Sequence, residues 1–265
     1  MNVAVKDLSK REVQKITKKA EYEGRIYPSK RFGDMVIIEY LNCKEVVIKF
    51  LNTGCVVTES LGSIKSGEIR DKSLPTTCGV GFIDIEGAAP KGIMTPVYKT
   101  WKAMLQRCYD EKELIKYTSY KDCTVSESFK YLSKFKKWYD KQVGHDVKGF
   151  QLDKDILVKG NKVYSEDTCC FVPAEINSAL VTSGSRRGQH PQGVIYNSTK
   201  TRYRARIQRG NKWESLGAYD TPEEAFIVYK PIKVAHIKSL ANKCKDQIDV
   251  RVYDALMNWA IEVTD

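Results

Sequence analysis

Residues 193–225 constrain the fold of this 265-residue chain more than any other stretch. Within them, residues 202–207 read Arg-Tyr-Arg-Ala-Arg-Ile, so arginine alternates with an aromatic or aliphatic residue. Because successive side chains of a β-strand point to opposite faces, this pattern predicts Arg202, Arg204 and Arg206 on one face and the apolar residues packed inward. Like charges on one face repel each other, so folding alone does not favour the pattern, whereas an anionic partner does. We therefore expect this face to bind nucleic acid rather than to be an ordinary solvated surface.

The overall charge agrees with this expectation. The formal net charge is +11 at pH 7, which is typical of a protein with a polyanionic partner, either nucleic acid or an acidic membrane surface. Residues 186–245 contain 13 Lys or Arg and 4 Asp or Glu, so most of the positive excess lies around the arginine pattern. No apolar run approaches the roughly 20 residues of a membrane span, and residues 1–20 carry charges where a signal peptide has an apolar segment. We expect a soluble, intracellular protein.

Eight cysteines raise the question of a zinc or disulfide framework. They are scattered along the chain without any Cys-x-x-Cys pair, which argues against a zinc ribbon. We expect reduced thiols that mostly fill the core, including the vicinal pair Cys169 and Cys170, which lies in an apolar, strand-like run.

Periodicity and turn residues predict a modular α+β protein with domains at residues 1–90, 91–182 and 190–265. The first is a small β-rich module with a basic N-terminal helix, the second has packed helices and a strand-strand-helix unit, and the third is a three-stranded antiparallel sheet plus helix. The expected elements are a helix over 6–23; strands over 35–40, 45–50 and 55–59; helices over 97–110 and 126–141; strands over 150–158 and 168–172 with a helix over 173–180; strands over 193–196, 203–208 and 212–217; a helix from 222 to about 240, which Pro231 should kink or split; and a helix over 250–263.

The C-terminal part matches a known pattern in order and spacing. The matching residues are Gly193-Val194-Ile195-Tyr196, Tyr203-Arg204-Ala205-Arg206-Ile207 and the run from Leu216 to Ala225. This part resembles the plant ethylene-response-factor (Apetala-type) DNA-binding domain. The resemblance implies a sheet that lies in the major groove of double-stranded DNA, with a helix packed behind it. It also implies DNA contacts from Tyr196, Arg202, Arg204, Arg206 and Trp213.

The middle part carries a second pattern. Its residues are Trp101, Met104, Arg107-Cys108-Tyr109, Leu152 to Ile156, Gly160 to Ser165, Cys170 to Pro173 and Asn177. It resembles a divergent HNH (His-Me finger) endonuclease of the kind found in phage homing endonucleases. In that family, a histidine at the end of the first strand activates water and a residue of the following helix helps to hold a divalent ion. In this chain the position of that histidine corresponds to Lys154, and His145, His190 and His236 all lie outside the predicted hairpin.

Three interpretations of the middle part stay open. In the first, Asp153 and Asp155 bind Mg²⁺ with Asn161 or Asn177 nearby, and His145 reaches in from the preceding loop. The Asp-x-Asp spacing supports it, since both carboxylates would share a strand face, where a bound cation relieves their repulsion. In the second, the site uses an altered base, and in the third it is an inert scaffold kept for DNA binding.

The N-terminal part, with Phe32-Gly33, Tyr40, Phe50 and Thr53-Gly54 among its residues, resembles a small module that recurs beside such nuclease-like domains in phage proteins. Taken together, the resemblances imply a phage DNA-binding protein in the cytoplasm of an infected bacterial host that cleaves DNA with a divalent cation. The alternatives are an inert DNA-binding regulator derived from such an enzyme and an interaction or inhibitor protein.

Overall fold

A computed structural model describes residues 10–181, 190–199, 201–210 and 212–264. The protein is a mixed α+β chain that divides into two compact units, Met1–Glu86 and Gly87–Asp265. Each unit is described by itself.

The first unit is an antiparallel meander that is contacted by two helices, one before it and one after it in the chain. Its strands pair in the order β1-β2-β3-β4, so the meander holds one strand, β1, that was not predicted. Alternating burial along β3 places Val46, Ile48 and Phe50 in a core where all three are 0% exposed. The elements are α1 (Lys10–Tyr22), β1 (Ile26–Ser29), β2 (Gly33–Asn42), β3 (Glu45–Phe50), β4 (Val56–Glu59) and α2 (Leu61–Ser66).

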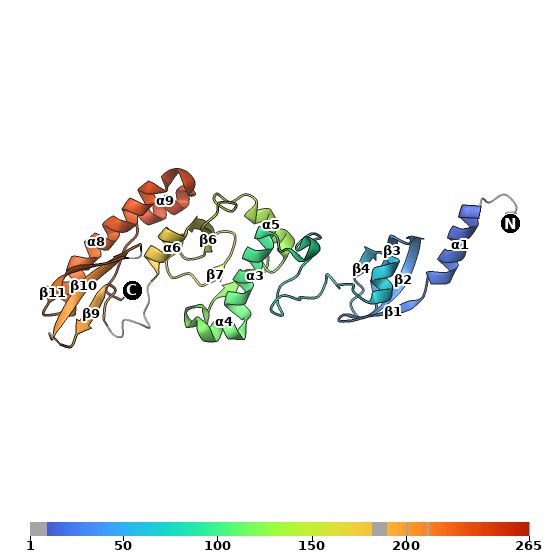
Figure 1. Ribbon diagram of the computed structural model, residues 1–265, viewed down its shortest axis with the longest axis horizontal. Coiled ribbons are helices and arrows are strands. Elements are labelled where there is room, and N and C mark those ends of the chain that lie inside the picture. Colours follow the sequence, from blue (N-terminus) through green and yellow to red (C-terminus); the bar gives the residue numbers. More distant parts are fainter. Residues whose placement is uncertain (1–9, 182–189, 200, 211, 265) are drawn as a thin grey trace. The chain divides into compact units, whose positions relative to one another are not determined.

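The second unit holds the remaining elements (Figure 1). They are η2 (Pro90–Gly92), α3 (Pro96–Tyr109), α4 (Glu111–Lys116), η3 (Thr118–Tyr120), β5 (Thr124–Val125), α5 (Leu132–Tyr139), β6 (Phe150–Asp153), β7 (Val163–Tyr164), β8 (Cys170–Pro173), α6 (Ala174–Leu180), β9 (Val194–Asn197), β10 (Arg202–Arg209), β11 (Lys212–Tyr219), α8 (Pro222–Lys243), η4 (Lys245–Gln247) and α9 (Val250–Met257).

Two helices, α3 and α5, pack together as expected, and Phe129, which lies just before α5, joins their aromatic side chains. The indole Nε1 of Trp101 donates a hydrogen bond to the carbonyl of Phe129 at 2.7 Å, and the rings of Phe129 and Phe135 meet edge to face at 5.0 Å. The helix expected from residue 126 begins only at Leu132. Its start is delayed because the Ser126 N–H donates to the carbonyl of Tyr164 (2.9 Å) and so extends the β5–β7 pairing.

The expected order of strand, strand and helix is present in β6, β8 and α6. Strands β6 and β8 pair antiparallel, with Asp153 opposite Cys170, and α6 follows β8 directly. The first strand is shorter than expected, because it ends at Asp153 rather than near residue 158.

The C-terminal sheet is antiparallel, in the order β11-β10-β9, and α8 packs against all three strands (Figure 1). Helix α8 begins with a capping box in which Thr221 and Glu224 satisfy each other's backbone N–H groups. It continues through Pro231 as one helix, so of the two effects expected of the proline, a kink or a split, the split does not occur. Proline removes the bond to the Ile227 carbonyl one turn earlier, and Ile227 is 68% exposed, so that carbonyl lies on the solvent side of the helix.

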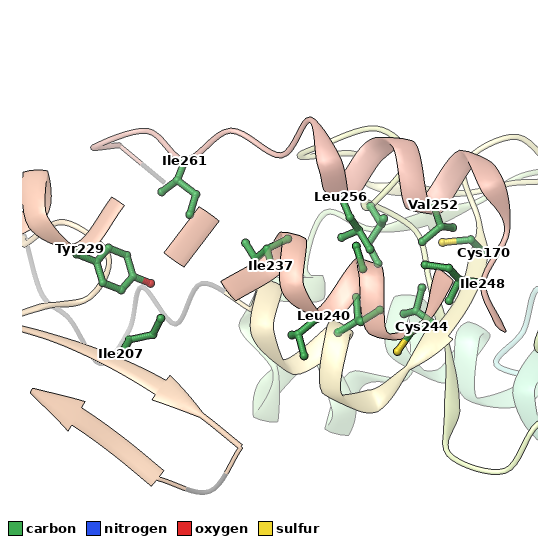
Figure 2. Close-up of a cluster of buried hydrophobic side chains, with 14 of the residues drawn as sticks. Cys170, Ile207, Tyr229, Ile237, Leu240, Cys244, Ile248, Val252, Leu256 and Ile261 are labelled. Carbon is green, nitrogen blue, oxygen red and sulfur yellow. The ribbon is translucent and has the colours of Figure 1, made fainter. Parts of the chain in front are cut away.

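A single hydrophobic core connects the parts expected as separate domains at 91–182 and 190–265. Cys170 and Val172 of β8 and Ile176 of α6 belong to the same buried cluster as residues of the C-terminal sheet, α8 and α9. Figure 2 shows Cys170 beside Val252 and Ile248 in this cluster. The β6–β8–α6 unit therefore shares its core with the C-terminal helices.

None of the eight cysteines, all of which are among the described residues, forms a disulfide bond, and five of them, including Cys169 and Cys170, are buried. Burial raises the pKa of both vicinal thiols, which keeps them protonated and unreactive. Among the described residues, no helix has the length and apolar character needed to cross a membrane.

Candidate nucleic-acid interface and central cavity

The C-terminal sheet turns one face to α8 and the other, which we call the arginine face (Arg202, Arg204, Arg206 and Trp213), to solvent. The predicted alternation along β10 is confirmed, since Ala205 and Ile207 are 0% and 1% exposed on the helix side. Arg204 and Arg206 are half-buried and Arg202 is exposed on the opposite side.

The three arginines differ in their partners, so they are not equivalent charges. The Nε of Arg202 lies 2.9 Å from Oδ1 of Asp220, which compensates part of its charge. The guanidinium of Arg206 lies over the ring of Trp213, 4.1 Å from its centroid, and this indole is 56% exposed. Arg204 forms no ion pair within the described part of the chain. The uncompensated charge of the face therefore comes from Arg204 and Arg206.

Tyr196 does not belong to this face, contrary to the sequence-based expectation. Its Cα pairs with that of Tyr203 across β9 and β10, and directly paired residues point to the same side of a sheet. The two rings lie 5.1 Å apart, and Tyr203 packs against the core on the helix side. The register of β9 thus turns Tyr196 away from the arginines.

A cavity of about 720 Å³, which we call the central cavity, brings together residues that the sequence analysis selected for catalysis. It is lined by His145 from the loop before β6, by Asp153 at the end of β6, by Asp155 and by Asn177 of α6. These residues are up to 32 positions apart in the chain, and the β6–β8–α6 unit places them at one site.

The two aspartates are close because the chain turns, and not because they share a strand face. Oδ1 of Asp153 accepts the backbone N–H groups of Asp155 at 2.8 Å and Ile156 at 2.9 Å, which ends β6 and bends the chain. Burial and the neighbouring Asp155 carboxylate raise the pKa of Asp153 from its ordinary value to about 6. In the described part of the chain, no three His, Cys, Asp or Glu side chains are grouped to share a metal ion.

Lys154 occupies the position where the resemblance places the general base. It is 6% exposed, and its Nζ lies 3.2 Å from Oδ2 of Asp155 and 5.8 Å from the centroid of the Tyr164 ring. Burial alone would lower the pKa of Lys154, but the charges of Asp155, Cys123 and Asp153 and the hydrogen bond to Asp155 together outweigh it, so the pKa is raised. A protonated ammonium has no lone pair, so Lys154 cannot act as the altered base at neutral pH.

His145 and Asn177 are oriented by their neighbours. Nδ1 of His145 lies 2.8 Å from the carbonyl oxygen of Gln142, and since a carbonyl only accepts, Nδ1 is the donor, so in the neutral ring the lone pair is on Nε2. The ring of His145 packs edge to face on Tyr139 at 4.9 Å. Nδ2 of Asn177 donates to Oε1 of Gln151 at 2.7 Å.

Asn161, expected beside the metal, has a different place. It is not among the residues that line the central cavity. Its Nδ2 donates to the carbonyls of Lys154 and Val163, both at 2.7 Å, and its Oδ1 accepts the N–H of Val163 at 3.2 Å. Through these hydrogen bonds, Asn161 stabilises the loop that follows Lys154.

Several cations of the central cavity were not predicted as site residues, although Arg107 and Lys162 belong to the pattern described for the middle part. They are Lys99, Arg107, Lys159 and Lys162. Lys99 and Arg107 are eight residues apart on α3, with Ala103 between them on the same polar face, opposite the buried Trp101 and Met104. That helical spacing was visible in the sequence, but it does not reveal what the polar face meets. With Lys154 included, five cations and the two aspartates line the cavity, so its net charge is positive.

The arginine face and the central cavity lie in the same compact unit, which runs from Gly87 to Asp265. Comparison of the chain with protein-family models, curated proteins and solved structures finds no match. The function is therefore inferred from the residues of these two surfaces.

Proposed function

We propose that this chain binds double-stranded DNA through the arginine face and cleaves a phosphodiester bond in the central cavity with the help of a divalent cation. The observation that carries the proposal is the convergence of two aspartates, a histidine and an amide in one basic cavity of the unit that also holds the arginine face.

DNA binding is supported by the chemistry of the arginine face. Guanidinium groups bind phosphates and the O6 and N7 atoms of guanine, and sheets read the wide major groove of DNA. Arg204 and Arg206 project from the central strand, and Trp213 adds an exposed ring beside them. The narrow major groove of an RNA duplex would not admit such a sheet, so DNA is the favoured partner.

Binding of a phosphodiester in the central cavity is supported by its excess of cations. Lys99, Arg107, Lys159 and Lys162 are set around Asp153 and Asp155. Such a charge distribution attracts a polyanion.

For the reaction, the residues of the cavity divide into two groups. Asp153 and Asp155 would hold Mg²⁺, since carboxylate oxygens are its preferred protein ligands and one or two often suffice when a substrate phosphate completes the site. Burial is the larger cause of the raised pKa of Asp153, and repulsion by the Asp155 carboxylate adds to it; a bound cation would relieve this repulsion, which agrees with the assignment. The ion, when bound, stabilises negative charge on the leaving oxygen. His145 accepts a proton from water at Nε2, and Asn177 positions the phosphate.

A second candidate function is DNA binding without cleavage, and one observation favours it. The ammonium of Lys154 already lies beside Asp155 and supplies the positive charge that a metal would otherwise provide. In that case the β6–β8–α6 unit is an inert scaffold that contributes only phosphate contacts.

One experiment separates these functions. The full chain is incubated with supercoiled plasmid and Mg²⁺ or Mn²⁺, with Asp153→Asn as the test variant and Asp167→Asn, an exposed carboxylate outside the cavity, as the control. Relaxed or linear plasmid that appears with the wild type and the control but not with Asp153→Asn supports cleavage. A gel shift without product establishes the inert function, and no shift at low salt would contradict DNA binding altogether.

A further inference from the structure

A second hollow, which we call the edge groove, lies at one edge of the C-terminal sheet and has a volume of about 830 Å³. Strand β9 pairs with β10 only as far as Val194 opposite Ala205, and the Arg206 N–H then donates to the carbonyl of Gly193 at 2.9 Å. Beyond this point the edge of β10 is not paired with β9. The groove occupies this edge and is bounded by α6 and α8.

Two buried polar side chains line the edge groove. Lys233 of α8 is 6% exposed and Gln192, which precedes β9, is 8% exposed. Within the described part of the chain, neither side chain forms a hydrogen bond or an ion pair. Buried polar groups in folded proteins are almost always satisfied, and an unpaired buried ammonium is especially costly. This cost indicates that the groove is built for a ligand that accepts hydrogen bonds.

The charges around Lys233 favour an anion. His236 on α8 and Arg206 on β10 also line the groove. The acidic residue among the described lining is Glu175, whose Oε2 is engaged at 2.8 Å by Nζ of Lys243. Desolvation lowers the pKa of Lys233 to about 8, as expected for an ammonium that is buried without compensation by a carboxylate.

The remaining walls are aromatic and apolar. Tyr229 is 3% exposed, and its ring lies directly against the backbone of Gly193. At the other side stand the indole of Trp213 and the guanidinium of Arg206 stacked on it. A flat ring suits this pair, since bases stack on aromatic rings and on guanidinium groups.

We propose that the edge groove binds a nucleoside monophosphate unit, with the phosphate on Lys233 and Gln192 and the base against Trp213 and Arg206. A phosphate monoester has three terminal oxygens and a phosphodiester has two, so either can accept from both the ammonium and the amide. The volume of the edge groove, about 830 Å³, lies within the usual range for pockets that bind small ligands.

The nucleoside monophosphate that the edge groove binds can come from two sources with the same chemistry. One is a free nucleotide, and the other is an unpaired nucleotide of a DNA strand. The edge groove shares Arg206 and Trp213 with the arginine face, but the inference is carried by Lys233 and Gln192, which lie outside that face, and it does not rest on the proposed function. It adds a site at the sheet edge to the face that we propose to bind the duplex.

The test is calorimetric titration of the full chain with deoxyadenosine monophosphate, deoxyadenosine and inorganic phosphate. Lys233→Met and Gln192→Leu are the test variants, and Lys238→Met, which removes a lysine of the same helix outside the groove, is the matched control. We expect the monophosphate to bind the wild type and Lys238→Met equally. The affinity of Lys233→Met should fall about ten- to hundredfold, the usual size of a charge-assisted hydrogen bond, and that of Gln192→Leu should fall less.

A second titration identifies the source. The affinity for duplex DNA with one unpaired nucleotide is compared with the affinity for a fully paired duplex. If the wild type binds the duplex with the unpaired nucleotide more tightly and Lys233→Met does not, the edge groove binds a nucleotide of DNA. If the wild type binds both duplexes equally, the edge groove binds the free nucleotide. Three results would each overturn the proposal. They are equal affinity for deoxyadenosine and deoxyadenosine monophosphate, an affinity of Lys233→Met for the monophosphate that equals that of the wild type, and no binding of either the free monophosphate or the unpaired nucleotide of DNA. Duplex binding by the arginine face is read separately from the paired duplex, so failure of one proposal is distinguishable from failure of the other.

Discussion

The Nζ atom of Lys154 lies 3.2 Å from Oδ2 of Asp155, and the lysine side chain is 7% exposed while the aspartate side chain is 45% exposed. An internal ammonium thus stands beside a carboxylate that we propose as a ligand of a divalent cation. The two positive charges compete for the same oxygen atoms, and this competition decides whether the central cavity holds a metal.

Removal of the ammonium is therefore expected to strengthen metal binding. Lys154→Met should bind Mn²⁺ several-fold more tightly than the wild type, because Asp155 is no longer neutralised from within. Titration calorimetry with Mn²⁺ at neutral pH measures the effect. Lys159→Met is the control, since it removes another ammonium that lines the central cavity and whose Nζ donates to the carbonyl of Ala260. Weaker binding by Lys154→Met than by this control would contradict the expected competition.

The arginine face should show unequal contributions to DNA affinity. Arg204→Ala and Arg206→Ala should each weaken duplex binding and reduce the slope of log affinity against log salt by about 0.9 for each phosphate that is no longer neutralised. Arg202→Ala should change the slope less, because Asp220 already compensates that guanidinium. Fluorescence anisotropy across a KCl series gives all three slopes. If the slopes of Arg204→Ala and Arg206→Ala matched that of the wild type, these two arginines would not bind phosphates.

Asp153 should destabilise the fold at neutral pH. Its pKa in the folded chain is about 6, above the ordinary value, so folding is penalised once the carboxyl ionises, and wild-type stability falls as pH rises from about 4 to 6. Asp153→Asn keeps the Oδ1 acceptor for the N–H groups of Asp155 and Ile156 while removing the charge. Above pH 6 it should be more stable by up to about 3 kcal/mol, with no gain below pH 4. Urea unfolding at these pH values measures the difference, and a gain independent of pH would show another cause.

Lys233 should give the opposite pH dependence. Its pKa in the folded chain is about 8, below the ordinary value, so the buried ammonium penalises folding up to pH 8 and the penalty fades as pH rises further toward 10. Lys233→Met should be more stable than the wild type at pH 7 by about 3 kcal/mol, with the gain shrinking above pH 8. Urea unfolding at pH 7 and pH 10 tests this, with Lys238→Met as the control. A loss of stability at pH 7 would mean that Lys233 has a partner in the fold.

Gly193 should tolerate no side chain. A Cβ at this position would lie 2.2 Å from Cδ2 of Tyr229, and the residue has a φ of +79°. Gly160 has the same φ with nothing within 4 Å of its Cβ position, so it isolates the backbone effect. Gly160→Ala should cost about 1 to 2 kcal/mol from the left-handed conformation, and Gly193→Ala about 1 to 3 kcal/mol more from overpacking. Equal losses in thermal unfolding would show that the ring of Tyr229 moves freely.

Local patterns were sufficient for much of the fold. Alternation along residues 202–207 predicted both the strand and its buried face, and Ala205 and Ile207 are buried as expected. The same holds for α3, whose buried residues Trp101 and Met104 follow helical spacing. These features follow from backbone geometry within a few residues, so the sequence is enough to predict them.

What lies next to each element was decided by tertiary structure. The sequence by itself determined that this chain is a basic α+β protein with an arginine-bearing strand and a pair of aspartates ahead of a short helix. The tertiary structure alone decided that Tyr196 lies on the helix side of the sheet and that Asn161 hydrogen-bonds within a loop. It also decided that Lys154 pairs with Asp155 and that Lys233 is buried in the wall of the edge groove. The physical reason is that strand register, burial and the electrostatic environment of a side chain depend on residues far away in the chain, which no local pattern encodes.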